Sequence, residues 1–245
     1  MLNRLAVTVI VVIAFTIIAV AVNAYPWYLG LNRSIKWNNG IALTDDNVLL
    51  DVKYADPGNS KLTVILVHDY GQDKTFWSKL DLDERLLNYD NAVVSFDLRF
   101  HGNSTPVLAS GGGTYVVSSE DDYVDDIKTM VKWAEKNIGK PIVIISYGEV
   151  SKAVLQGISE LDDKNIRGVV LIAVDYKDVA TLINKTNVNI MVLSNDPNWS
   201  NVPVYFVGIG VSRDGMVKWS NDQLDLLFNW IKNTAFNASN LKASE

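Results

Sequence analysis

The first hydrophobic feature of the chain is a continuous apolar run at residues 5–24. It contains no charged side chain, and its polar side chains are Thr8, Thr16 and Asn23. A helix of about 20 residues spans the ~30 Å hydrocarbon core of a bilayer, and a helix that is apolar on every face suits lipid. The pattern therefore predicts a transmembrane helix over residues 5–24, in contact with membrane lipid and preceded by a short flank at residues 1–4.

A cleaved secretory signal is the alternative explanation of this run. Arg4 supplies a minimal positive region, and Val22 and Ala24 form a small-residue cleavage site. The apolar run is longer than the ~7–15 residues of a signal core, and the aromatic side chains within 25–28 suit a membrane interface. We therefore prefer a retained signal anchor, followed by a juxtamembrane linker at residues 25–38.

Beyond the linker, the hydrophobic pattern changes to short runs. Two apolar runs flank the turn residues 45–47, which predicts a β-hairpin over residues 41–56. Continuous apolar runs then alternate with segments of helical period, as expected for buried strands joined by helices. The predicted strands are 62–67, 92–96, 142–145, 169–174, 190–193 and 204–207. The predicted helices are 75–87, 121–137, 150–161 and 222–232.

This alternation indicates an α/β fold with a mostly parallel central sheet and helices on both faces, extended by the N-terminal hairpin. We place this domain at residues 39–235 and a C-terminal tail at residues 236–245. The segment 120–126 carries five acidic side chains, which we interpret as a solvated first helical turn, favoured by the helix dipole, rather than as a cation site.

Composition excludes several classes of function. The chain has no cysteine, so it holds no disulfide or thiolate metal site. Its net charge of −6 and the lack of a basic stripe argue against nucleic-acid binding. Two histidines leave little scope for a histidine-rich metal centre. We predict no metal and no cofactor.

Basic residues flank the apolar run on both sides, so they do not decide its orientation in the membrane. The glycosylation sequons do favour one orientation. A chance origin is the alternative, because the chain is rich in Asn and Ser. Five matches nevertheless favour a single-pass protein of the cell membrane with its domain outside the cytoplasm. The acceptor positions are Asn32, Asn103, Asn184, Asn198 and Asn237.

Three segments that follow predicted strands carry the most specific local signals. The first, after strand 62–67, reads His68-Asp69-Tyr70-Gly71. The second, after strand 92–96, follows the pattern D-x-R-x-H-G-x-S, with Asp97, Arg99, His101, Gly102 and Ser104 at its specified positions. The third is the strand–turn–helix at 141–153. In this order the segments resemble the α/β-hydrolase superfamily, and the resemblance covers residues 40–233.

The resemblance implies that the first loop, residues 68–71, is equivalent to the oxyanion loop and that the third segment holds the nucleophile elbow G-x-S-x-G. One alignment places Ser146 at the first glycine and Gly148 at the nucleophile, which then has no side chain. A shifted alignment makes Ser146 the nucleophile, but Ile144 then occupies the first glycine position. We prefer the first alignment.

The other two members of the triad are also in question. The superfamily takes its histidine from a loop after the last strand, whereas this chain has no histidine beyond His101. Asp196 and Asp214 are candidates for the acid, but an acid without an imidazole to orient contributes little to acyl transfer. We therefore expect no intact catalytic set.

Three functions remain open at this point. The first is a non-catalytic accessory or partner-binding protein of a membrane or cell-surface complex, which we prefer. The second is a membrane-anchored esterase or peptidase with an atypical site around Ser146 or Ser151. The third is binding of a small ligand above the carboxyl edge of the sheet, near Tyr70, Tyr147 and Gly148.

Overall fold

A hairpin forms one edge of the sheet. β1 (Asn38–Leu43) and β2 (Val48–Ala55) pair antiparallel, with Asn38 opposite Tyr54 and Leu43 opposite Leu49. Asn47 takes the left-handed conformation in the turn, with φ of 66°, which asparagine tolerates better than most residues. The hairpin predicted at residues 41–56 is confirmed.

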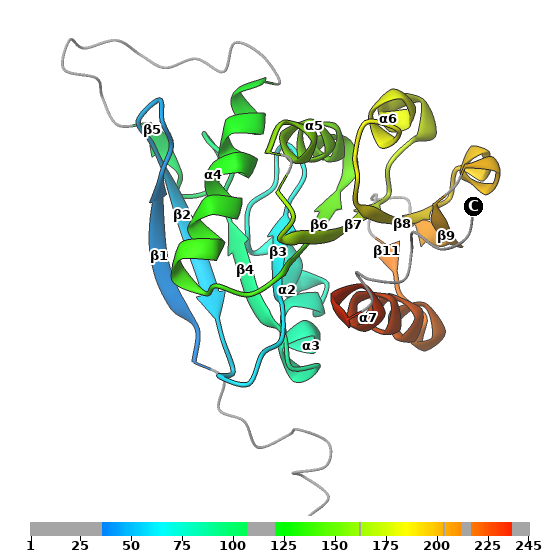
Figure 1. Ribbon diagram of the computed structural model, residues 1–245, viewed down its shortest axis with the longest axis horizontal. Coiled ribbons are helices and arrows are strands. Elements are labelled where there is room, and N and C mark those ends of the chain that lie inside the picture. The colour runs from blue at the N-terminus through cyan, green and yellow to red at the C-terminus, as the bar shows by residue number, and fades with distance from the viewer. Residues whose placement is uncertain (1–35, 107–120, 162, 203, 212–216, 237–245) are drawn as a thin grey trace, which may run out of the picture. The chain divides into compact units, whose positions relative to one another are not determined.

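The computed structural model describes residues 36–106, 121–161, 163–202, 204–211 and 217–236 (Figure 1). Within these ranges, no helix is both long and apolar enough to cross a membrane. The predicted anchor at 5–24, the sequons at Asn32 and Asn237, and Asp214 lie outside the described residues.

The central sheet is mixed and mostly parallel. Its order is β1-β2-β4-β3-β6-β7-β8-β9, with the two-residue β5 paired to β2. From β4 to β9 all neighbours run parallel, whereas β2 is antiparallel to β1, β4 and β5. A separate ladder joins β10 (Gly210–Val211) and β11 (Val217–Lys218). The remaining strands are β3 (Thr63–Val67), β4 (Ala92–Phe96), β5 (Thr105–Pro106), β6 (Ile142–Tyr147), β7 (Ile166–Ile172), β8 (Asn189–Ser194) and β9 (Tyr205–Gly208).

Helices cover both faces of this sheet (Figure 1). One face carries α4 (Asp121–Asn137), α5 (Ser151–Leu161) and α6 (Tyr176–Ile183). The other carries α2 (Phe76–Lys79), α3 (Leu82–Asn88) and α7 (Asn221–Phe236). Two 3-10 turns, η1 (Gly148–Val150) and η2 (Pro197–Asn201), follow β6 and β8. The predicted α/β architecture is confirmed.

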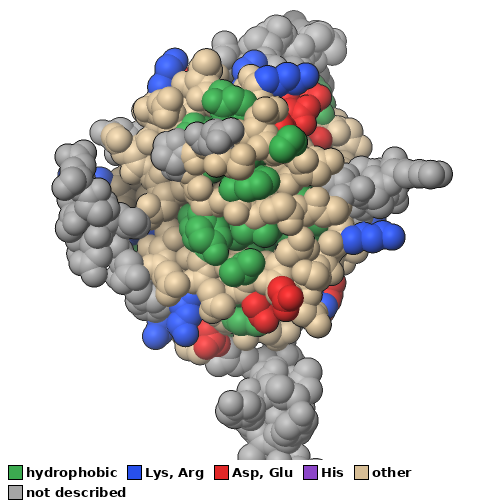
Figure 2. Space-filling model, turned by 90° about the vertical axis from the view of Figure 1, so that its right-hand side faces the viewer, with side chains coloured by type: hydrophobic (Ala, Val, Ile, Leu, Met, Phe, Trp, Pro, Cys, Tyr) green, Lys and Arg blue, Asp and Glu red, His purple; other side chains and the backbone are tan. Residues whose placement is uncertain are grey.

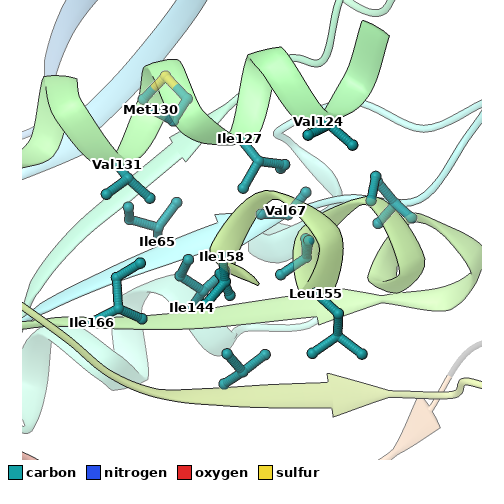
Figure 3. Close-up of a cluster of buried hydrophobic side chains, with 14 of the residues drawn as sticks. Ile65, Val67, Val124, Ile127, Met130, Val131, Ile144, Leu155, Ile158 and Ile166 are labelled. Atoms are coloured by element: carbon teal, nitrogen blue, oxygen red, sulfur yellow. The ribbon is translucent and has the colours of Figure 1, made fainter. Parts of the chain in front are cut away.

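The main core lies between the sheet and the α4–α5 layer. Ile65 and Ile144 project from neighbouring strands toward Ile127 and Val131 of α4 (Figure 3). Strands β3, β4 and β6 are buried along their whole length, which explains why their sequences are continuously apolar. Each fully buried aliphatic side chain contributes about 1.5–3 kcal/mol relative to exposure. On the β9 side of the domain, hydrophobic side chains gather near the centre of the surface and charged ones toward its rim (Figure 2).

Two local predictions differ from the structure. The helix predicted at 75–87 is two short helices, α2 and α3, because Asp81 between them has φ of 56°, a left-handed conformation that interrupts the helix. Helix α6 was not predicted from the sequence, although its apolar residues at 176, 179, 180 and 183 follow a helical period, because it is only eight residues long.

Candidate functional site

The three motif segments meet at one edge of the sheet. β3 pairs in parallel with β4 on one side and β6 on the other, with Val67 level with both Phe96 and Ser146. Because the carboxyl ends of these strands are level, the loops that follow them are neighbours. The structure therefore brings residues 68–71, 97–104 and 146–149 together.

The turn after β6 has the strand–turn–helix geometry of a nucleophile elbow. Gly148 lies at the turn with φ of 72°, and α5 begins at Ser151. Ser146 lies within the buried strand, where its Oγ is 2.8 Å from Oγ of Ser151, and both side chains are fully buried. The residue at the tip of the turn is thus glycine, and the nearest serines bond to each other beneath it.

The carboxylate of Asp69 fills the space above this glycine. A Cβ atom built on Gly148 would overlap the Asp69 carboxyl group, so no side chain fits at position 148 while Asp69 holds this place. The Asp69 Oδ1 accepts a hydrogen bond of 3.3 Å from the backbone N–H of Val150, and the backbone N–H groups of Tyr70 and Glu149 also bond to this carboxylate.

Two of these N–H groups, those of Glu149 and Tyr70, correspond to the donors that an active elbow directs at an oxyanion, namely that of the residue after the nucleophile and one from the first loop. In this chain they bind an internal carboxylate instead. Burial raises the pKa of Asp69, as does the nearby charge of Glu149, while the N–H donors oppose that rise. The Asp69 carboxyl group thus occupies the position above Gly148 and engages these donors.

The two histidines connect the first and second loops. The His68 Nε2 accepts from the N–H of Leu98 at 3.0 Å, and the His101 Nε2 accepts from the N–H of Gly71 at 2.9 Å. The Nδ1 of His68 is 2.8 Å from the carbonyl of Asp69, so it carries the proton. Burial lowers the pKa of His68 to about 4. With both ring nitrogens engaged by backbone, His68 acts as a structural link.

The second loop is organised around Asp97. Its Oδ1 accepts from the N–H of Lys74 at 2.7 Å, and its Oδ2 accepts from the Lys74 ammonium at 2.6 Å and from the N–H of Asn103 at 2.8 Å. Gly102 has φ of 50°, and a Cβ there would overlap the Asp97 carboxylate. The Ser104 Oγ donates to the Asp97 carbonyl at 2.6 Å. These residues hold the loop in shape.

Arg99 joins this loop to the helix layer and to the hairpin. Its guanidinium is 2 % exposed and forms ion pairs of 2.9 Å with Asp126 and 2.7 Å with Asp46. The Asp126 carboxylate also accepts from the Arg99 N–H at 2.8 Å. The nearby carboxylates raise the pKa of Arg99 above its ordinary value despite burial.

Asp196 lies after β8 and caps two local segments. Its Oδ2 accepts from the N–H of Tyr176 at 2.9 Å, and its Oδ1 accepts from the N–H of Asn198 at 3.0 Å. These backbone donors lower the pKa of its carboxyl group. The second acid candidate, Asp214, lies outside the described residues. The described sequon positions Asn103, Asn184 and Asn198 are all exposed.

Sequence reasoning missed the charged partners of the motif. Lys74, Asp46 and Asp51 have no family pattern around them, and each lies far along the chain from the residue that it contacts. The interpretation of the acidic run at 120–126 as a solvated helical turn is wrong at Asp126, whose side chain is fully buried and pairs with Arg99. Within the described ranges, no cluster of three or more His, Asp or Glu side chains is arranged to hold a metal ion.

No protein-family model and no curated protein matches the sequence. Among solved structures, an esterase from Pyrococcus furiosus is 24 % identical, with 69 % of this chain and 72 % of that one covered and a TM-score of 0.53. A structure described as a predicted CIB-like hydrolase from Thermoplasma acidophilum is 12 % identical, with 82 % and 100 % covered and a TM-score of 0.60. These similarities show that the fold is that of the α/β hydrolases.

Proposed function

We propose that this protein of the α/β-hydrolase fold is non-catalytic, and that it is a membrane-anchored accessory subunit or partner-binding protein with its domain outside the cytoplasm. The observation that carries the proposal is the place of Asp69. Its carboxylate fills the space of a nucleophile above Gly148 and takes up the N–H groups of Tyr70, Glu149 and Val150. A carbonyl substrate would find neither a nucleophile nor free oxyanion donors there.

Several features of the site agree with this proposal. His68 and His101 each engage both ring nitrogens in contacts with the backbone, and Asp196 is occupied as a cap. A general base must reach the proton that it removes. The polar groups of this edge of the sheet therefore serve the fold, which leaves the surface of the domain to carry the function.

Reactivity toward a fluorophosphonate probe tests the proposal. The full chain in neutral detergent should remain unlabelled and should hydrolyse no short-chain ester, beside an active serine esterase of the same fold as the positive control. Stoichiometric labelling that disappears in Ser146→Ala but persists in the exposed-serine control Ser200→Ala would instead establish a membrane-anchored hydrolase with an atypical site.

The membrane anchor and the exported domain are proposed from the sequence. The apolar run at 5–24 and the sequons support them. Extraction of cell membranes with alkaline carbonate should leave the chain in the pellet, and treatment with peptide N-glycosidase should increase its gel mobility. Release into the supernatant would favour a cleaved signal instead.

A further inference from the structure

One face of edge strand β1 carries exposed aliphatic side chains. β1 is the last strand at one edge of the sheet, with α4 beside it (Figure 1). Trp133 of α4 lies against Gly40, so α4 covers the β1 face to which position 40 points. Side chains alternate along a strand, so Ile41 and Leu43 point to the opposite face. They are 64 % and 57 % exposed, more than any other large hydrophobic side chain in the described ranges.

Trp37 continues this face toward the N-terminus. It comes directly before β1, at the same alternation as the exposed aliphatic residues. The Lys53 ammonium lies 4.0 Å from the centroid of its ring. We call Trp37, Asn39, Ile41 and Leu43 the β1 face. Its combination of tryptophan, a neighbouring lysine and aliphatic side chains is typical of surfaces at a membrane interface.

The free edge of β1 is capped at its centre. Ile41 lies opposite Asp51, whose N–H donates to Ser104 and whose carbonyl accepts from the N–H of Asp97. Asp51 thus directs both backbone groups away from β1. Opposed residues of an antiparallel pair share one pattern, so the backbone groups of Ile41 point outward, where the Trp133 indole N–H donates to its carbonyl at 3.1 Å. This cap opposes pairing with a strand of a partner or of a second copy.

The chain leads to this face from the predicted anchor. Residues 25–35 join the apolar run at 5–24 to Lys36, and these eleven residues cannot span more than about 40 Å. Arg33 is their only charged side chain, and most of the others are aromatic or aliphatic. This composition favours the membrane interface over water. A link of this length and composition keeps β1 close to the bilayer, where an exposed apolar patch suits contact with lipid.

We propose that the β1 face docks on the surface of the bilayer in which the chain is anchored, with Ile41 and Leu43 entering the interface between headgroups and acyl chains. This inference rests on the proposed membrane anchor and adds a second contact, made by the domain itself. A single helix leaves the domain free to rotate about its link. Docking through β1 holds the domain in one orientation and leaves its other surfaces to a partner.

A single fluorescent label tests this contact, because the chain has no native cysteine. Asn39→Cys, at an exposed position within the β1 face, is labelled with the fluorophore NBD. The full chain is then reconstituted in phosphatidylcholine vesicles in which part of the lipid carries a nitroxide quencher near its headgroup. This label should lose most of its emission. The same label at Tyr205→Cys, on the strand at the opposite edge of the sheet, should keep its emission.

Two substitutions separate docking from mere nearness to the anchor. Ile41→Thr/Leu43→Thr, made in the Asn39→Cys background, keeps side chains that a strand accommodates but removes apolar surface. Quenching should then fall to the level of Tyr205→Cys, with little change in Tm because both positions are exposed. Tyr205→Thr in the same background is the matched control and should leave quenching unchanged. Full quenching in Ile41→Thr/Leu43→Thr would overturn the proposal, as would its absence in Asn39→Cys alone.

Other occupants of the β1 face give different results, and each of these would overturn the proposal. A second copy would make the emission depend on the ratio of protein to lipid rather than on the nitroxide. Cover by residues 25–35 would give the same blue-shifted, unquenched emission in vesicles and in detergent. Alkaline carbonate extraction tests the anchor separately. A chain that stays in the pellet with an unquenched label keeps the anchor and loses the docking, whereas a chain that is released loses both.

Discussion

His68 and His101 form a reciprocal pair between two loops, in which each imidazole accepts a backbone N–H from the loop of the other. His68 takes the N–H of Leu98, and His101 takes the N–H of Gly71, with the ring centroids 5.4 Å apart. Protonation of either accepting nitrogen would break its bond, because an imidazolium has only donors. The pair therefore ties the integrity of this edge of the sheet to pH.

The pKa of His68 predicts a specific pH window. It is lowered from 6.5 to about 4 in the folded protein, so the unfolded chain binds more protons between these values. From this residue, stability should fall by about 3 kcal/mol as the pH is lowered from about 6.5 to about 4. Burial raises the pKa of Asp126 to about 6, so this carboxyl group contributes a change of the opposite sign over part of the range, and a His68 variant is needed to isolate the imidazole. Urea unfolding of the full chain in detergent, followed by tryptophan fluorescence across this range, measures the effect.

The control variant is His68→Gln, whose amide oxygen can accept the N–H of Leu98 without titrating. It should remove the contribution of the imidazole to the pH dependence of stability above pH 4 and leave that of Asp126. Asp46, Asp51 and Asp73 have lowered pKa values, so the stability that they contribute is lost only as the pH falls through values below 3.8. An unchanged slope in His68→Gln would show that another group is responsible.

Gly148 should be intolerant of any side chain. Gly148→Ala places a Cβ against the Asp69 carboxylate at a left-handed φ, so we expect a loss of about 2–4 kcal/mol. Gly58→Ala is the matched control, since Gly58 has φ of 83° with nothing within 4 Å of its Cβ position. It should lose only about 1–2 kcal/mol, the cost of the backbone conformation.

Removing Asp69 separates overlap from backbone strain. The double variant Asp69→Gly/Gly148→Ala is compared with the single variant Asp69→Gly. The additional loss in the free energy of unfolding should be no larger than the loss that Gly58→Ala causes. Equal losses with and without Asp69, in a double-mutant cycle measured by urea unfolding, would show that the carboxylate does not occupy this space in solution.

Hydrophobic pattern predicts the frame of this protein well. The segment 121–137 is helical over the predicted range, and the buried strands begin and end within a few residues of their apolar runs, because burial on both faces demands such runs. Local departures from this pattern were harder to predict from the sequence. The break at Asp81 depends on a single left-handed residue, and α6 is only eight residues long.

The chemistry of the site was only partly predictable. The sequence shows that position 148 is glycine, and it indicates which loops meet. It does not show that Asp69 occupies the space above Gly148, since the contact between Asp69 and Val150 spans 81 positions along the chain. The left-handed conformation of Phe100, with φ of 62°, is likewise visible only in the structure.

The buried ion pair between Asp97 and Lys74 should dominate the stability of the second loop. Asp97→Asn removes the charge of a buried carboxylate that accepts from the Lys74 ammonium and from the N–H of Asn103, while Asp51 still pairs with Lys74. We expect a loss of about 2–4 kcal/mol, because hydrogen bonds to a charged group are lost in a buried place. Asp81→Asn, which removes an exposed pair with Arg85, should cost less than about 0.5 kcal/mol.

Thermal unfolding of these two variants provides the measurement. A loss in Asp97→Asn as small as that in Asp81→Asn would mean that water replaces the buried contacts, and that the D-x-R-x-H-G-x-S segment is not held by its first residue.

Ser146 and Ser151 should behave as a structural pair. Ser146→Ala removes the partner of a fully buried hydroxyl, which should cost about 1–3 kcal/mol because the remaining group stays desolvated and unbonded. Ser146→Ala/Ser151→Ala removes both hydroxyls and should be less destabilised than the sum of the single variants by about 1–2 kcal/mol. Additive losses in urea unfolding would show that the two hydroxyls do not depend on each other. Ser146 would then be free to take part in other chemistry, and the atypical hydrolase would become the better explanation of this site.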